Sequence, residues 1–438
     1  MTGHRPDIAD VIDAQKMAGT PLLVAFLAAL ALLVDGYDVQ VMALAVPSLA
    51  RDWALPETSF GLALSGVVIG ITLGSGFLGS LGDRYGRRTV LAVGLAGTGL
   101  ATMATALATT PGQFVFWRVL TGLMLGAGLP NCFALASEFT PLRRRSMMVG
   151  LMNIASPLGA FSAGFLAPPV LEAFGWRGTF MLGGLAPLLV AAALLVLAPE
   201  SLKFLAIRRP TDPRISAILR RIAPGLDPAS VRLDGAGSAA ATHGAWRELL
   251  SHEFRTRTLL LWAMLWLNLF NLYVLISWLP TLLHQAGWDM TAALRGAVLI
   301  QAGGIGGGIA ISLFLDRGAS RLALTLGFAL AALNLAAFPL IANGGGWIAL
   351  LLLAGAGTSG CQLALNALSA AYYPPAIKAT GIGASLLVGG VGSIIGPLAG
   401  AVLIEQGLPA TTILALLAVA PTACIAMTLL IKREWQAH

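Results

Sequence analysis

Long apolar stretches separated by short polar loops dominate the chain of 438 residues. Twelve of these stretches reach the length of about 20 residues that an α-helix needs to cross the hydrocarbon core of a bilayer. The pattern therefore predicts an all-α integral membrane protein with twelve transmembrane helices. The predicted spans are residues 22–49, 60–81, 89–108, 113–136, 147–170, 177–198, 258–282, 292–315, 322–341, 347–370, 380–404 and 409–431.

One long polar segment interrupts this pattern after the sixth span. Residues 199–257 are rich in arginine, proline and serine, whereas the other interruptions are short. We therefore expect an N-terminal six-helix bundle at 1–198, a cytoplasmic central loop at 199–257 and a C-terminal six-helix bundle at 258–438.

The basic residues indicate how the chain is oriented. If both termini are cytoplasmic, 23 of the 27 lysines and arginines fall in cytoplasmic segments, and only Arg51, Arg177 and Arg295 fall on the other side. This bias is typical of multi-pass membrane proteins, so we expect an even number of spans with both termini cytoplasmic. The net charge of +7 then reflects topology, and we expect the lipid bilayer and no nucleic acid as a partner.

Enzymatic chemistry has no support in the sequence. The chain has no HExxH or GxSxG motif, its five histidines are scattered, and its three cysteines lie in apolar segments without a CxxC pair. We therefore expect neither an enzyme nor a metal site, and no cofactor apart from protons as a coupling ion.

A short charged motif occurs twice, 233 residues apart. "DRYGRR" begins at Asp83 and "DRGASR" at Asp316, and each directly follows an apolar span. A repeat of six spans keeps both copies in the same orientation. Two such bundles, with a substrate site near the midplane between them, form one of the known transporter architectures.

The two copies of this motif predict conformational latches. An aspartate in a tight loop accepts hydrogen bonds from a helix N-terminus or a neighbouring arginine in one conformation and releases them in another. A plain loop with cytoplasmic positive charge is the alternative, which the second copy disfavours. Glu138, at the end of the fourth span, predicts a second charge cluster with Arg143, Arg144 and Arg145, or else a helix-end acid beside solvated bases. The latch residues are Gly79, Asp83, Arg84, Arg87, Arg88, Glu138, Arg143, Asp316 and Arg317.

Two carboxylates interrupt the first apolar run. Asp35 and Asp38 are spaced i, i+3 and share one helix face, away from Tyr37. A charged side chain at this depth costs roughly 2.5–3.5 kcal/mol even on insertion scales. Two carboxylates in a poorly hydrated cavity do not both ionise easily, so the pair is a candidate proton carrier. The alternative is that Asp35 forms a structural ion pair with Arg118. The ion pair and proton carrying are compatible, because protonation of the aspartate would release the arginine.

Other polar residues within the spans are candidates for substrate binding. Arg118 is the only basic residue inside a span, and a guanidinium can bind a carboxylate through two hydrogen bonds. Snorkelling to the membrane surface is its alternative. In the second half, amide and indole groups share helix faces and suit a small, planar, polar ligand, or else bond neighbouring helices. The candidates are Arg118, Tyr37, Asn271, Trp278, Gln301, Gln362 and Asn366.

Several segments resemble a known transporter family. "GSLGDRYGRR" resembles the loop motif of the major facilitator superfamily, although "DRGASR" lacks its paired terminal bases. "LVDGYDVQVMALAVPSL" resembles the first span of the aromatic acid:proton symporters, a branch of that superfamily. "SWLPTLL", "PESLKFL" and "RVLTGLMLGAGLPNCFALASEF" are also similar to that branch.

This resemblance implies a function for the candidate residues. It implies a proton-coupled importer of aromatic carboxylates such as benzoate, hydroxybenzoates, protocatechuate, gallate or phenylpropionates, working by alternating access. Asp35 and Asp38 would be needed for uptake, Asp83 and Asp316 for conformational cycling, and Arg118 for coupling or binding. We expect a monomer in the cytoplasmic (inner) membrane of a bacterium.

At two positions the sequence departs from the family pattern. The branch commonly has an arginine between the tenth and eleventh spans and another twelve residues later, where this chain has Lys378 and Gly390. Either Arg118 or polar groups then hold the substrate carboxylate, or the substrate differs from the simplest benzoates. A proton-driven efflux antiporter of the same fold and a membrane sensor for aromatic acids are the alternative functions.

Overall fold

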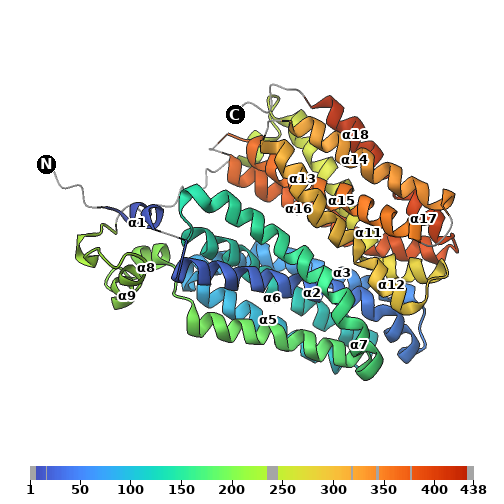
Figure 1. Cartoon of the computed structure of the whole chain (residues 1–438), viewed down its shortest axis with the longest axis horizontal. Helices are drawn as coiled ribbons and strands as arrows, with labels where there is room; N and C mark the ends of the chain where they lie inside the picture. The colour runs from blue at the N-terminus through green and yellow to red at the C-terminus, as the bar shows by residue number, and fades with distance from the viewer. Residues whose placement is uncertain are drawn as a thin grey trace. The chain divides into compact units, whose positions relative to one another are not determined.

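The computed structural model describes residues 6–15, 17–233, 245–316, 319–341, 345–374 and 377–431. Over these residues the regular elements are helices, and one isolated bridge joins Asp7 to Arg232. The α-helices (Figure 1) are α1 (Ile8–Ala14), α2 (Thr20–Trp53), α3 (Gly61–Phe77), α4 (Gly82–Tyr85), α5 (Arg87–Ala106), α6 (Pro111–Glu138), α7 (Leu142–Leu197), α8 (Leu202–Arg208), α9 (Pro213–Ile222), α10 (Ala245–Leu249), α11 (Arg255–Gln285), α12 (Met290–Ala297), α13 (Leu299–Asp316), α14 (Ser320–Ala337), α15 (Gly345–Ala371), α16 (Lys378–Glu405), α17 (Ala410–Leu416) and α18 (Val419–Leu430). Short 3-10 turns are η1 (Glu57–Phe60), η2 (Gly79–Leu81), η3 (Pro228–Ser230) and η4 (Phe338–Leu340).

The predicted membrane-spanning helices are present. Within the described residues, 11 helical segments are long and apolar enough to cross a bilayer. One of them, α7, has 56 residues and would be about 84 Å long as a straight helix, more than twice the hydrocarbon thickness. It changes direction at Gly175, whose φ of 64° breaks the helical conformation. Counting α7 as two spans gives the predicted twelve.

The chain forms two compact units whose boundaries cut across the helices. The first comprises Met1–Gly36, Ile69–Gly159 and Phe180–Ala240, and the second comprises Tyr37–Val68, Ala160–Thr179 and Ala241–His438. The division into regions 1–198, 199–257 and 258–438 follows chain order instead and stays a prediction.

Glycines set the close helix contacts in each unit, and these contacts repeat along the sequence. A Cβ added at Gly70 would overlap the carbonyl oxygen of Val119, and one at Gly303 would overlap that of Leu352. Both members of the second pair lie 233 residues after those of the first. The same offset relates Gly74–Leu123 to Gly307–Ala356, and Gly159–Leu33 to Gly392–Trp266. The repeat indicated by the two charged loops therefore extends to how the helices pack.

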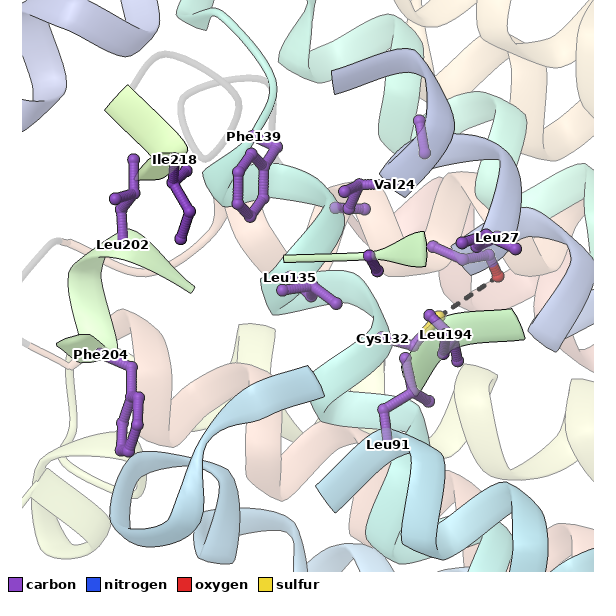
Figure 2. Close-up of a cluster of buried hydrophobic side chains, with 14 of the residues drawn as sticks. Val24, Leu27, Leu91, Cys132, Leu135, Phe139, Leu194, Leu202, Phe204 and Ile218 are labelled. Atoms are coloured by element: carbon purple, nitrogen blue, oxygen red, sulfur yellow. Dashed lines mark hydrogen bonds between the residues drawn. The ribbon is translucent and has the colours of Figure 1, made fainter. Parts of the chain in front are cut away.

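A cluster of buried side chains joins the first unit to the start of the central loop. Figure 2 shows Leu135, Cys132 and Leu91 between helices, with Phe139 and Val24 nearby and Leu202, Phe204 and Ile218 contributed by α8 and α9. The Cys132 thiol donates a hydrogen bond to the carbonyl oxygen of Ala28 at 3.3 Å. Burying these apolar groups holds α8 and α9 against the helix ends, so this part of the central loop is folded.

Candidate transport site

The two carboxylates of the first span lie in the interior of α2. Asp35 is 8% exposed and Asp38 is 1% exposed, whereas Tyr37 is partly exposed. Charged side chains are seldom buried to this extent unless they serve a specific interaction. Their positions on α2 agree with the shared face expected from their spacing.

Gly36, between the two carboxylates, brings α2 against α7. A Cβ at Gly36 would overlap the backbone carbonyl of Ser156, and a Cβ at Gly159 would overlap that of Leu33. The two backbones therefore touch, and the Ser156 hydroxyl lies 3.4 Å from Asp35 Oδ2, to which it donates. The glycine of the D-G-Y-D element thus gives Asp35 a hydroxyl neighbour.

Arg118 is enclosed within the first unit. Its side chain, on α6, is 0% exposed. The guanidinium carbon lies 5.3 Å from the centre of the Phe180 ring, and Phe114 meets the same ring edge-on at 5.5 Å. A cation over an aromatic face is attracted by the ring quadrupole, so Phe180 helps to hold this charge inside the protein.

Side-chain amides link α11 to α15 in the second unit. Asn268 Nδ2 donates to Thr358 O at 3.1 Å and to Gln362 Oε1 at 2.9 Å. Gln362 Nε2 in turn donates to Asn366 Oδ1 at 3.1 Å. The predicted pair of Gln362 and Asn366 does share a helix face, and Asn268 extends it into a chain. These bonds tie helices together, and a substrate contact for Gln362 and Asn366 stays a prediction.

The other candidate residues of the second half point to different neighbours. Asn271 Nδ2 donates to Leu417 O at 3.1 Å, whereas Trp278 Nε1 donates to Pro397 O at 2.7 Å. Gln301 is buried in α13, at 6% exposed. The indole N–H of Trp278 is therefore engaged by α16, and the bonds of Asn271 and Trp278 run to separate helices.

The offset of 233 residues relates the carboxylates to two of these amides. Asp35 corresponds to Asn268, and Asp38 corresponds to Asn271. Pro47, inside α2, likewise corresponds to Pro280, inside α11. The first helix of each repeat therefore has polar side chains at the same two positions, acidic in one and neutral in the other.

The first predicted latch forms a charge cluster in the first unit. Arg87 donates to Asp83 Oδ1 at 3.3 Å and also to Glu138, which accepts a further hydrogen bond from the Ser201 hydroxyl. The Asp83 side chain is 72% exposed, whereas that of Glu138 is 12% exposed. Of these two acids, Glu138 is the enclosed one, and Asp83 lies at the surface.

Glu200 is part of this cluster, although the sequence did not predict a role for it. Its carboxylate accepts hydrogen bonds from the backbone N–H of Arg88 at 2.9 Å and of Thr89 at 3.3 Å. These are orphan donors of the first turn of α5, so the acid caps that helix and complements its dipole. Gly86 has a φ of 106°, and a Cβ there would overlap the carboxylate. In the sequence, the sign of this role is a single acidic residue directly after the predicted sixth span.

The remaining latch residues of the first loop also have structural contacts. The Arg88 guanidinium donates to Ala198 O at 2.9 Å, and that of Arg84 lies over the Tyr85 ring. The carbonyl oxygen of Gly79 accepts a hydrogen bond from Asn131 Nδ2 at 3.0 Å.

Two parts of the latch prediction remain. Of the bases expected beside Glu138, Arg143 donates through Nη2 to Gln15 O at 3.0 Å, and Arg145 lines a cavity together with Glu138 and Arg87. In the second copy, Asp316 ends α13, while its side chain and all of Arg317 lie outside the described residues. Lys378 and Gly390, where the sequence departs from the family pattern, lie at the start and in the middle of α16.

Comparison with known proteins identifies the family. Residues 28–397 match the family model of the Major Facilitator Superfamily. The chain belongs to this superfamily. It is therefore a membrane transporter and not an enzyme, as expected from the sequence.

Its relatives include transporters of aromatic acids. The chain is 34% identical to the gallate transporter of Pseudomonas putida, over 92% of this chain and 90% of that protein. It is 33% identical to the 4-hydroxybenzoate transporter PcaK of Pseudomonas aeruginosa, over 98% and 96% of the two chains. The resemblance to aromatic acid transporters of this superfamily is thereby confirmed.

Solved structures show the same fold. The inward open conformation of the xylose transporter XylE from E. coli matches with a TM-score of 0.70 at 17% identity, over 93% of this chain and 95% of that one. A partially occluded inward open conformation of XylE matches with a TM-score of 0.68 at 18% identity, over 93% and 98%. At this identity the match supports the predicted fold class alone.

Proposed function

We propose that this protein imports an aromatic carboxylate together with protons by alternating access of its two repeats. Asp35 and Asp38 carry the protons, and the charge cluster around Asp83 and Glu138 opens and closes during the cycle. The transported acid resembles hydroxybenzoate, protocatechuate, gallate or a phenylpropionate. In support, the relatives named as gallate and 4-hydroxybenzoate transporters are 34% and 33% identical over 92% and 98% of this chain, and one named as a 3-(3-hydroxy-phenyl)propionate transporter is 31% identical over 84% of it.

The proposal that transport is coupled to protons rests on one observation, the burial of both carboxylates in one apolar helix. Keeping two buried carboxylates ionised within a few residues of each other is costly. Their protonation therefore removes charge from the interior and lets the helix interfaces rearrange. The Ser156 hydroxyl, 3.4 Å from Asp35, is a neutral neighbour that can donate to the ionised form and accept from the protonated form.

Uptake into proteoliposomes tests the proposal directly. Radiolabelled 4-hydroxybenzoate, protocatechuate, gallate, benzoate and 3-hydroxyphenylpropionate are offered separately, with an inward proton gradient and with that gradient collapsed by a protonophore. We expect accumulation of at least one acid only with the gradient. Loss of preloaded acid under the same gradient would instead indicate an antiporter, and binding without movement would indicate a sensor.

The variants Asp35→Asn and Asp38→Asn separate proton coupling from substrate movement. We expect each to abolish gradient-driven accumulation, while exchange of labelled for unlabelled acid across the membrane continues because it requires no net proton transfer. Asp212→Asn is the control, since this acid caps α9 and bonds the exposed Arg214. Normal accumulation by either α2 variant would remove that aspartate from the coupling mechanism.

A further inference from the structure

A buried side-chain amide on α2 has no hydrogen-bond partner among the described residues. Gln40 is 1% exposed, and neither Oε1 nor Nε2 has a partner within the part of the chain that the structure describes. Buried polar atoms are almost always hydrogen-bonded, because an unpaired group loses its water without replacement. A leucine would fill nearly the same space without this penalty. The fold therefore gains nothing from the amide, which suggests a partner that comes and goes.

Gln40 lies on the face of α2 that lines a cavity. Leu44, Pro47, Ser48 and Arg51 follow it at spacings of 4, 7, 8 and 11 residues, which place them on the same side of a helix. These four residues line a cavity of about 580 Å³ in the second unit, together with residues of α7 and α12. This volume is in the range of small-molecule pockets. Gln40 is thus one helical turn beyond the cavity.

The length of α2 separates Gln40 from the cation at the other end of this face. Arg51 is exposed, and its Nε donates to Pro47 O at 3.2 Å. Eleven residues of helix place the two Cα atoms about 16 Å apart along the axis, and the Arg51 side chain turns back toward Pro47. The amide acts at a deeper level, two residues after Asp38.

We propose that Gln40 binds a ring hydroxyl of the transported acid and thereby selects hydroxylated over unsubstituted aromatic carboxylates. The proposal rests on the proposed function. A carboxamide offers one acceptor and two donors, and a phenolic hydroxyl both donates and accepts. A carboxylate only accepts, so it would leave Oε1 unpaired. A site that pairs its buried polar groups with a substrate hydroxyl rejects the analogue that lacks it.

Substitution by leucine tests this role with two readouts. Initial uptake rates of labelled 4-hydroxybenzoate and benzoate are measured in proteoliposomes containing wild-type protein or Gln40→Leu. We expect the wild type to prefer 4-hydroxybenzoate, and the variant to lose about tenfold or more of that preference. We also expect its thermal unfolding temperature in detergent to equal or exceed that of the wild type, because the unpaired amide is gone.

A paired amide elsewhere serves as the matched control. Asn334 on α14 is also buried, but its Nδ2 donates to Leu330 O at 2.7 Å. Asn334→Leu should lower the unfolding temperature and leave the preference unchanged.

The outcomes distinguish this proposal from the proposed function. An unchanged preference in Gln40→Leu, or an unfolding temperature clearly below the wild type, would overturn the role of Gln40 while aromatic acid transport stands. A wild type that moves none of the acids would overturn the proposed function, and this inference with it.

Discussion

The first helices of the two repeats differ at two equivalent positions. On α2 these are Asp35 and Asp38, and on α11 they are Asn268 and Asn271. The amides bond fixed acceptors, since Asn268 bonds Thr358 and Gln362 of α15, and Asn271 bonds Leu417. Carboxylates change charge with protonation, whereas amides do not.

The difference suggests a division of labour between repeats that share their helix packing. We infer that the side chains that change charge during transport lie in the first repeat. At the equivalent positions of the second repeat, the amides form hydrogen bonds that persist through the cycle. The position between the polar pair differs as well, because Gly36 corresponds to Leu269. The close approach of α2 to Ser156 therefore depends on a residue that the second repeat lacks at this place.

Replacing Gly36 by leucine, the residue at the equivalent position of the second repeat, should have the largest effect. In Gly36→Leu the new side chain would start inside the carbonyl group of Ser156, so α2 and α7 must separate. We expect little or no monodisperse protein after extraction in detergent, measured by size-exclusion chromatography, because the cost exceeds about 3 kcal/mol.

A second glycine controls for the substitution itself. Gly76 on α3 has open space around its Cβ position, so Gly76→Leu should be recovered like the wild type. A well-folded Gly36→Leu protein would show that the α2–α7 contact is not required.

Replacing Asn268 of the second repeat by aspartate, the residue at the equivalent position of the first repeat, should have the next largest effect. Asn268→Asp removes both hydrogen bonds from Nδ2 and places an anion beside Thr358 O and Gln362 Oε1, which are themselves acceptors. We expect a loss of stability of about 3 kcal/mol, seen as a lower unfolding temperature in detergent.

The same helix provides a control for the added charge. Gln285 is exposed at the end of α11, so Gln285→Glu should unfold at the wild-type temperature. If Asn268→Asp is as stable as the wild type, the second repeat accepts a carboxylate at this register and the proposed division of labour is wrong.

The loops that follow the equivalent second and eighth spans allow a smaller test. Glu200 caps α5 in the first repeat, whereas the N-cap residue of α14 is Ala319, which has no polar side chain to donate or accept a capping hydrogen bond. Glu200→Gln keeps one acceptor but loses the charge beside the helix N-terminus, which should cost about 1–2 kcal/mol. The unfolding temperature should fall by a few degrees.

An acid on the surface provides the reference for this substitution. Glu248, which is exposed on α10, should tolerate Glu248→Gln without a measurable change. Equal unfolding temperatures for the two variants would mean that the Glu200 cap contributes nothing to stability.

The fold could be predicted from the sequence because its strongest determinants are local. A run of apolar residues predicts a span wherever it occurs, and the recurrence of the DRxxxR motif at Asp83 and Asp316 indicates the repeat. Two predicted spans are nevertheless broken in the structure. Residues 292–315 form α12 and α13, which divide at Val298, and residues 409–431 form α17 and α18, which divide at Leu417 and Ala418.

The candidate site could be predicted only in part. Asp35 and Asp38 stand out because charge is rare in an apolar run. Gln40 does not, because an amide in a span usually bonds a neighbouring helix, and only the three-dimensional contacts show that its atoms are unpaired. Glu200 was missed for a related reason, since the donors that it meets are 111 and 112 residues away.

The cap that Glu200 places on α5 sets an order for biogenesis. Residue 200 leaves the ribosome long after α5 has been made, so the start of α5 stays uncapped while α6 and α7 are synthesised and inserted. Contacts between residues so far apart in sequence form late. The charged loop at Asp83 can therefore take its final structure only when all six spans of the first repeat are in the membrane. A nascent chain stalled before Glu200 should leave this loop open to proteases.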